Sequence, residues 1–273
     1  MAAIGNGIKT TMATPARKFS IRTATPADVP RLASISAPAL MDDGFYDVLY
    51  PRRREFYDDY LHTWRLKLQK GILSDAVYLV AETDVADEST GRSRKEIVGW
   101  IAWQRMGTSA EAERIRAEGQ GVLKRLEHKL LTLTNTYVSP LIRFVLRTPP
   151  DRSADAAALA KMEARHPTFL AETFSGIYAE HWHVLMLVVD PKWQRRGIGQ
   201  MLVRWGLDRA QKEGVCVGLE ASDPGAPMYL KLGFEEIGRF HTPREGLHFP
   251  ALVWRPRGME GEGYGSGLGL GHR

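Results

Sequence analysis

One stretch of this 273-residue chain constrains its fold more than any other: an apolar run at 181–189, a cationic turn at 190–197 and a segment with helical spacing at 198–213. The apolar run, HWHVLMLVV, predicts a buried strand, and Gly214 is a typical helix terminator. Where a strand ends and a helix begins, the first helical N–H groups lack an intrahelical partner, and the helix dipole places about half a positive charge there. The sequence therefore predicts an anion-binding turn.

The composition of this turn suits a phosphate-bearing ligand. Gly197 and Gly199 let a ligand approach the backbone without meeting a β-carbon, and Lys192, Arg195 and Arg196 add positive charge that suits a pyrophosphate. We therefore interpret residues 194–199 as a phosphate cradle.

Two other phosphate-binding motifs compete with this interpretation. The Walker loop requires G-x-x-x-x-G-K-[ST], which the sequence lacks. The dinucleotide fingerprint fits better, because Gly197 and Gly199 open a helix after a strand and Glu220 lies near the place of a ribose-binding acid. It is disfavoured because Leu202 stands where close packing needs Gly or Ala, and because a long turn precedes the glycines. A dinucleotide-binding oxidoreductase is thus the less favoured alternative.

The same stretch, LVVDPKWQRRGIGQMLVRW, resembles the Q/R-x-x-G-x-G/A signature of the GNAT superfamily of acyl-CoA N-acyltransferases, with Gln194, Gly197 and Gly199 at the defining positions. Two further segments support the resemblance. LEASDPGAPMYLKLGF is similar to that family's fifth strand, turn and fourth helix, and IRTATPADVPRLASI is similar to its opening. The resemblance covers residues 181–256 well and 19–106 loosely, and it leaves out the segment between them.

The resemblance implies a mixed α/β fold: a GNAT-like twisted, mostly antiparallel sheet with splayed central strands, flanking helices and a helical insertion. The strands at 183–190 and 215–221 are expected to splay apart, so that the pantetheine of acetyl-CoA bonds to backbone groups left unpaired. We divide the chain into a disordered leader at 1–18, the N-acetyltransferase domain at 19–256 with its helical insertion at 107–180, and a Gly-rich disordered tail at 257–273.

Local patterns place further helices within this domain. Thr25 is a predicted N-cap, followed by Pro26 at the first helical position. A stripe of side chains that recur every four residues is predicted to pack in the core: Phe56, Tyr60, Trp64 and Leu68. In the insertion, SADAAALAKMEARHP predicts a helix that ends at Pro167.

The resemblance also implies acetyl-CoA as the co-substrate. Backbone N–H groups from Arg195 through Gly199 are expected to hold its pyrophosphate, and Leu187 to Val189 to pair with its pantetheine. Asp223 stands where the family often has an Asn that contacts the cofactor. The residues expected to bind the cofactor are therefore Leu187, Val188, Val189, Gln194, Arg195, Arg196, Gly197, Ile198, Gly199 and Asp223.

Acetyl transfer to an amine needs two proton transfers. An alkylammonium has a pKa near 10.4, so presenting it as a free amine at pH 7 costs about 4 to 5 kcal/mol, which a base must help to supply. Tyr229 lies at the family's general-acid position and would donate to the leaving thiolate. His183 is the first candidate base, because strand alternation places it on one face with Leu187 and Val189. Glu220 on the neighbouring strand is the second candidate.

Composition narrows the class of protein. The net charge is +5, but the basic residues are scattered among almost as many acidic residues, so we expect no nucleic-acid partner. The longest apolar run, at 184–189, is far shorter than the roughly 18 residues of a membrane span, so we expect no membrane partner. Cys216 is the only cysteine, which excludes an intrachain disulfide. His181 and His183 suggest two metal ligands, but no further ligands converge with them, and we expect no metal.

We therefore expect an N-acetyltransferase that moves an acetyl group from acetyl-CoA to a primary amine of a small molecule, by direct attack in a ternary complex. The alternative is a non-catalytic acyl-CoA-binding or sensing module that keeps the phosphate cradle but lacks a working base. We expect a monomer or homodimer in the cytoplasm, with the nucleus or mitochondrion as alternative compartments.

Overall fold

A computed structural model of the protein describes residues 18–86, 91–119, 126–127, 129–130, 133–134, 151–242, 244 and 246–259. Within these ranges the strands form one seven-stranded sheet in the order β1-β2-β3-β4-β5-β7-β6. All neighbouring strands pair antiparallel except β4 and β5, which pair parallel, so the predicted mixed α/β fold is confirmed. The strands are β1 Phe19–Thr23, β2 Val77–Ala86, β3 Ser93–Met106, β4 His181–Val189, β5 Cys216–Glu220, β6 Glu235–His241 and β7 His248–Trp254.

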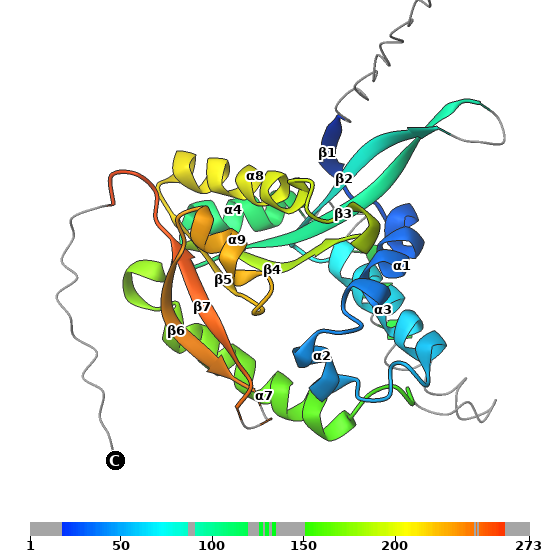
Figure 1. Ribbon diagram of the computed structural model, residues 1–273. Coiled ribbons are helices and arrows are strands. Elements are labelled where there is room, and N and C mark those ends of the chain that lie inside the picture. Colours follow the sequence, from blue (N-terminus) through cyan, green and yellow to red (C-terminus); the bar gives the residue numbers. More distant parts are fainter. Residues whose placement is uncertain are drawn as a thin grey trace, which may run out of the picture.

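Helices cover both faces of the sheet (Figure 1). Helices α1 and α3 pack with one face in one hydrophobic cluster, and α8 packs with the other face in a second cluster. None of the described helices is both long and apolar enough to cross a membrane. The helices are α1 Val29–Ala39, α2 Gly44–Leu49, α3 Tyr57–Ile72, α4 Ala110–Gly119, α7 Ala156–Thr173, α8 Ile198–Glu213 and α9 Ala226–Lys231, with short 3-10 helices at Pro26–Asp28, Gly176–Tyr178 and Pro191–Trp193.

The start of α1 follows the predicted cap. Thr25 is the N-cap of the 3-10 turn that leads into α1, and its backbone N–H donates to Asp28 Oδ2 at 2.7 Å. Arg22 donates to both oxygens of the same carboxylate, at 2.8 and 2.9 Å, which ties β1 to the helix start. Three residues of the predicted stripe of α3, Tyr60, Trp64 and Leu68, are buried in the cluster shared with α1. The fourth, Phe56, is the N-cap before the helix and is only half-buried, so its place in the core was predicted wrongly.

Strand β4 contains a β-bulge that strict alternation does not predict. Trp103 of β3 pairs with Val184, whereas the preceding residue of β3 pairs with Met186, so Leu185 is an extra residue without a partner. After the bulge, odd-numbered residues point to the face that even-numbered residues occupy before it. Leu187 therefore packs in the same cluster as Val184. The prediction that the histidines of β4 share a face with Leu187 was therefore wrong.

Strands β4 and β5 separate after a short paired stretch. Residues 181–183 of β4 pair with 216–218 of β5, and within the described part of the chain no later residue of β4 pairs with β5. The expected splay of the central strands is thus present. It leaves the β5-facing backbone edge of Leu187 to Val189 without a strand partner.

Helix α7, which belongs to the predicted insertion, lies beside the gap between β4 and β5. It begins at the N-cap Asp155, whose carboxylate accepts from the N–H groups of Ala157 and Ala158. The prediction that it ends at Pro167 was wrong, since the helix continues to Thr173 with the proline inside. An internal proline costs about 3 kcal/mol. The following turn packs against the sheet, where the ring centroids of Phe169 and Phe240 of β6 lie 4.9 Å apart, and this contact recovers part of that cost. The leader at 1–17, the tail from 260 and most of 120–150 lie outside the described residues.

Candidate active site

The phosphate cradle has a backbone shaped to bind an anion. Gly197 has φ +80° and is the N-cap of α8, and no side chain caps this helix start. Arg195 has φ +62°, a conformation that is uncommon for a residue with a side chain and that concentrates at functional sites. Residues of left-handed conformation within a turn direct successive N–H groups into a concave anion-binding nest. The first N–H groups of α8 are therefore free of side-chain acceptors.

Neighbouring elements hold the cradle in place. Gln194 donates from Nε2 to the Val189 carbonyl at 3.3 Å, which ties the turn to the end of β4. Asp190 caps the short 3-10 helix by accepting from Lys192 N–H, and its other oxygen accepts from Arg31 of α1 at 2.9 Å. The cationic side chains at 192, 195 and 196 are all exposed. The turn thus combines a fixed backbone with positive charge open to solvent.

The two glycines of the cradle serve different purposes. A β-carbon on Gly197 would meet nothing within 4 Å, so this position needs glycine for its backbone conformation. A β-carbon on Gly199 would lie 3.2 Å from Met228 Sδ and 3.6 Å from Leu187 Cδ2. Gly199 therefore allows α8, α9 and β4 to meet closely.

A cavity of about 280 Å³ continues from this meeting point between the separated strands. Its walls come from β4 and β5, from α9 and the loop before it, from the region around the start of α2, from α7, and from the β6–β7 hairpin. Residues that line it are Leu40, Asp43, Phe45, Tyr46, Met162, His166, Val184, Leu185, Met186, Leu187, Glu220, Ala221, Ser222, Gly225, Met228, Tyr229, Phe240 and Phe249.

Tyr229 lines this cavity from α9. Its side chain is buried, and its ring makes an edge contact with Phe234 at 5.5 Å. Burial raises the pKa of Tyr229 well above its ordinary value, so the phenol stays protonated and remains a hydrogen-bond donor at neutral pH. The resemblance placed the general acid at this residue, and the structure places it in the cavity wall.

Glu220, at the end of β5, is an ionised carboxylate in the same wall. Its Oε2 lies 3.4 Å from His166 Nε2 and 3.4 Å from His183 Nε2, while its Oε1 is buried with no partner among the described residues. Burial acts to raise the pKa of Glu220, but hydrogen bonding and attraction to the two imidazoles outweigh it and hold the pKa at about 2.

His183 lies behind Glu220 rather than in the cavity wall. It is 1% exposed, and its Nδ1 lies 3.2 Å from Nε2 of His181. Burial, followed by the neighbouring His183, lowers the pKa of His181 to about 3, so His181 is neutral. The structure brings the candidate bases His183 and Glu220 together, but only Glu220 lines the cavity.

Sequence reasoning missed His166, which the insertion contributes to this site. It lies on α7, four residues after Met162, and both side chains line the cavity. This spacing places them on one face of the helix. That periodicity identifies a face of α7, but the sequence does not show which part of the sheet that face contacts.

The remaining residues predicted to bind the cofactor differ in whether they line the cavity. Leu187 lines the cavity, whereas the Val188 side chain is buried in the opposite cluster, so only its backbone is placed to contact a ligand between the strands. Ile198 is buried beneath the cradle. Asp223 is exposed in the β5–α9 turn and does not line the cavity.

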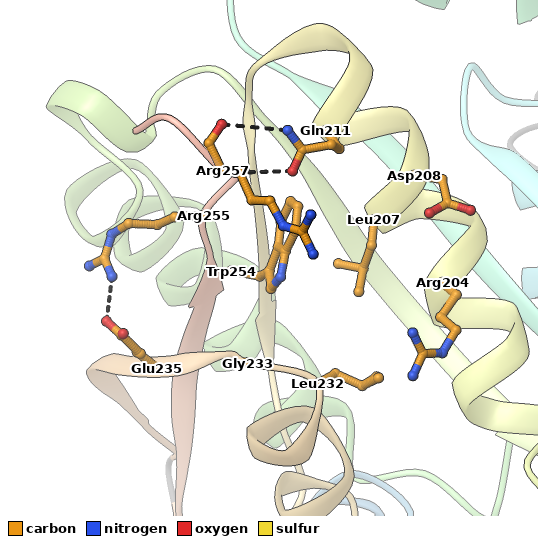
Figure 2. A pocket seen from close by; sticks show the side chains of 10 residues that line it. All are labelled: Arg204, Leu207, Asp208, Gln211, Leu232, Gly233, Glu235, Trp254, Arg255 and Arg257. Carbon is orange, nitrogen blue, oxygen red and sulfur yellow. Dashed lines mark hydrogen bonds and ion pairs between the residues drawn. The ribbon is translucent and has the colours of Figure 1, made fainter. Parts of the chain in front are cut away.

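A second hollow of about 800 Å³ lies farther along α8, between its C-terminal half and the end of β7 (Figure 2). None of the residues predicted for the site lines it. Gln211 bonds there to the backbone of Arg257, and Arg255 pairs with Glu235. Its lining residues are Arg204, Leu207, Asp208, Gln211, Leu232, Gly233, Glu235, Trp254, Arg255 and Arg257. The candidate site is therefore the smaller cavity between β4 and β5, next to the cradle.

Comparison with known proteins agrees with this location. Residues 164–236, which run from α7 through the cradle and α9 into β6, match the family described as acetyltransferase (GNAT) domain. A segment of 59 residues is 48% identical to an acetyltransferase of Stachybotrys chartarum, covering 22% of this chain and 26% of that protein. A segment of 46 residues is 48% identical to the probable acyltransferase SID5 of Ajellomyces capsulatus, covering 17% of this chain and 34% of that protein. The matched segments thus span only about a quarter to a third of these relatives.

Similarity of fold extends over more of the chain than these matched segments do. A solved structure described as histone acetyltransferase HPA2 and related acetyltransferase, from Corynebacterium glutamicum, superposes with a TM-score of 0.51 over 87% of this chain and 96% of that chain. The sequence identity is 18%, so this likeness concerns the fold alone.

Proposed function

We propose, from the GNAT acetyltransferase domain that this chain carries, that the protein is an acyl-CoA-dependent N-acetyltransferase that moves an acetyl group from acetyl-CoA to a primary amine of a small molecule. One observation carries the proposal: the cradle and the cavity are continuous. Leu187 and Met228 are the side chains that a β-carbon on Gly199 would meet, and both also line the cavity that holds Glu220 and Tyr229.

The residues present suit acetyl-CoA as the co-substrate. The N–H groups from Arg195 through Gly199 would hold the pyrophosphate, since they end in an uncapped helix start beside three exposed cations. The backbone edge of Leu187 to Val189 would bond to the pantetheine, because β5 does not pair with it. A cofactor bound in this way would direct its thioester into the cavity.

The side chains in the cavity match the needs of direct transfer. The acceptor nitrogen, once deprotonated, attacks the thioester carbonyl carbon, so that a C–N bond forms and the C–S bond breaks. The ionised Glu220 and its imidazole neighbours provide for the proton that leaves the ammonium group. Tyr229 donates to the departing sulfur, which is itself destabilised as a thiolate in an apolar cavity.

The cavity favours a small acceptor over a protein chain. Its walls include Phe45, Phe249 and Met162, from the α2 start, the hairpin and α7, so elements on several sides enclose the acceptor end. A volume of about 280 Å³ lies just below the usual range of small-molecule sites, which begins at about 300 Å³. We therefore propose an amine with a compact apolar body.

Thiol release from acetyl-CoA, measured across a panel of small amines and lysine-containing peptides, tests this proposal. The expected result is release with small primary amines and little with peptides. Release with peptides alone would contradict the small-molecule acceptor. Tight acetyl-CoA binding without thiol release with any amine would contradict catalysis and favour the sensing module.

A further inference from the structure

We infer that His166, on helix α7 of the insertion, is the catalytic base that takes the proton from the acceptor's ammonium group, and that Glu220 positions its ring. This inference rests on the proposed transfer of an acetyl group to an amine. It assigns a catalytic role to α7, a helix whose place at the site the sequence patterns did not predict.

Three imidazoles gather around Glu220, and only one of them lines the cavity. His183 has both ring nitrogens engaged, with Nδ1 3.2 Å from His181 and Nε2 3.4 Å from Glu220, and its side chain is almost fully buried. His181 lies one step farther from the cavity. His166 lines the cavity and its side chain is 32% exposed. An incoming amine can therefore reach His166 without displacing a buried contact.

The contact with Glu220 fixes how His166 would act. Its Nε2 lies 3.4 Å from Oε2 of the carboxylate, whereas its Nδ1 has no partner among the residues that the structure describes. An ionised carboxylate accepts a hydrogen bond but does not donate one, so Nε2 carries the proton and Nδ1 presents a lone pair. The carboxylate also stabilises the imidazolium that forms when Nδ1 takes up a proton, as the acid does in a catalytic triad.

Packing holds the ring in this orientation. The His166 ring makes an edge contact with Phe240 of β6 at 5.5 Å, and Phe169, on the next turn of α7, contacts the same phenylalanine. The titratable groups near His166 are Glu220 from β5, with His183 of β4 behind it, and three groups in the wall of the same cavity: Asp43, Tyr46 and Tyr229. Among these groups Glu220 is the one whose contact with a ring nitrogen is direct, at 3.4 Å from Nε2.

The protons balance through two routes. The ammonium group loses one proton to Nδ1 of His166, which later releases it to solvent. The nitrogen loses a second proton as the amide forms, and this proton balances the one that Tyr229 gives to the departing sulfur. The products are the N-acetyl compound, coenzyme A as the free thiol and one proton in solution.

The test compares His166→Gln with His183→Gln in the full chain, by measuring thiol release against pH with the best alkylamine acceptor. His166→Gln should lower kcat/KM at pH 7 by about 100-fold or more, lose the acidic limb of the profile and recover as rising pH deprotonates the acceptor in solution. His183→Gln should keep the acidic limb. His62→Gln, an exposed histidine of α3, is the matched control and should behave as the unsubstituted chain does.

An arylamine acceptor separates catalysis from structure, because its nitrogen is already neutral at pH 7 and needs no base for deprotonation. His166→Gln should then retain nearly full activity, and His166→Asn should repeat both results, so that a folding defect in one variant does not decide the test. Equal losses with alkylamines and arylamines, or an acidic limb abolished by His183→Gln alone, would overturn the role of His166. If the unsubstituted chain releases no thiol with any amine, the proposed function fails and the inference fails with it.

Discussion

Gly199 and Met228 face each other where α8 and α9 meet, and a β-carbon on Gly199 would lie 3.2 Å from Met228 Sδ. This distance is close, but the far end of a methionine side chain can move. We therefore expect Gly199→Ala to weaken acetyl-CoA binding only a few-fold, and Gly199→Val, with its branched side chain, to weaken it by about 100-fold, roughly 2.7 kcal/mol. Isothermal titration of acetyl-CoA measures both effects.

Met228→Ala supplies the control for this contact, because it removes the atom that the new β-carbon would meet. The double variant Gly199→Ala, Met228→Ala should bind acetyl-CoA more tightly than the sum of the single effects predicts. Strict additivity would mean that the close approach at Gly199 does not limit binding.

A second prediction concerns the choice of ligand at the cradle. Acetyl-CoA should raise the melting temperature of the chain, with a stabilisation of about 2.7 kcal/mol when its concentration is 100 times the dissociation constant. NADH should give no comparable rise, because Leu202 occupies the small-residue position of the dinucleotide fingerprint. A shift with NADH alone would favour the oxidoreductase.

Tyr229→Phe should lower kcat by more than about tenfold and leave the dissociation constant of acetyl-CoA nearly unchanged. The hydroxyl is needed only as the sulfur departs, whereas the ring keeps its contact with Phe234. Steady-state kinetics together with direct titration of acetyl-CoA separates these effects. A loss confined to cofactor binding would assign Tyr229 to packing.

Buried His181 makes stability depend on pH. Its pKa falls from 6.5 to about 3 in the folded chain because burial disfavours the charged ring. Between these values the unfolded chain binds a proton that the folded chain does not, so stability falls as pH drops below 6.5, by at most about 1.4 kcal/mol per pH unit from this residue.

Urea unfolding between pH 6.5 and 5 measures this contribution. Glu220, with its lowered pKa of about 2, loses its own contribution only below its ordinary value of 4.5, so this window excludes the contribution of Glu220. His181→Gln should show a flatter dependence in the same window. Parallel slopes for the variant and the unsubstituted chain would show that another group titrates.

Sequence reasoning succeeded where a local pattern decides the structure. The cap at Thr25 and the start of α8 at Gly197 depend on residues within one or two helical turns, and both were predicted. The contents of the site depend on distant partners. The bulge at Leu185 arises from pairing with β3, and the contact of His166 with Glu220 arises from the packing of α7 against β6. Local periodicity predicts neither the bulge nor the contact, because both depend on residues far away in the sequence. Pro167 ordinarily ends a helix, but α7 continues past it to Thr173.

The extra residue at Leu185 has a consequence for how this protein can change. Upstream of it the histidines point toward the α7 side, and downstream Leu187 points toward α8. Deleting Leu185 alone would restore simple alternation and leave the other side chains of β4 on their present faces, because Val184 and Leu187 already share one face across the bulge. A β4 shortened from its nine residues by this one would therefore still direct its histidines toward α7 and Leu187 toward α8, whereas the loss of a residue that pairs with β3 would force the bulge to move.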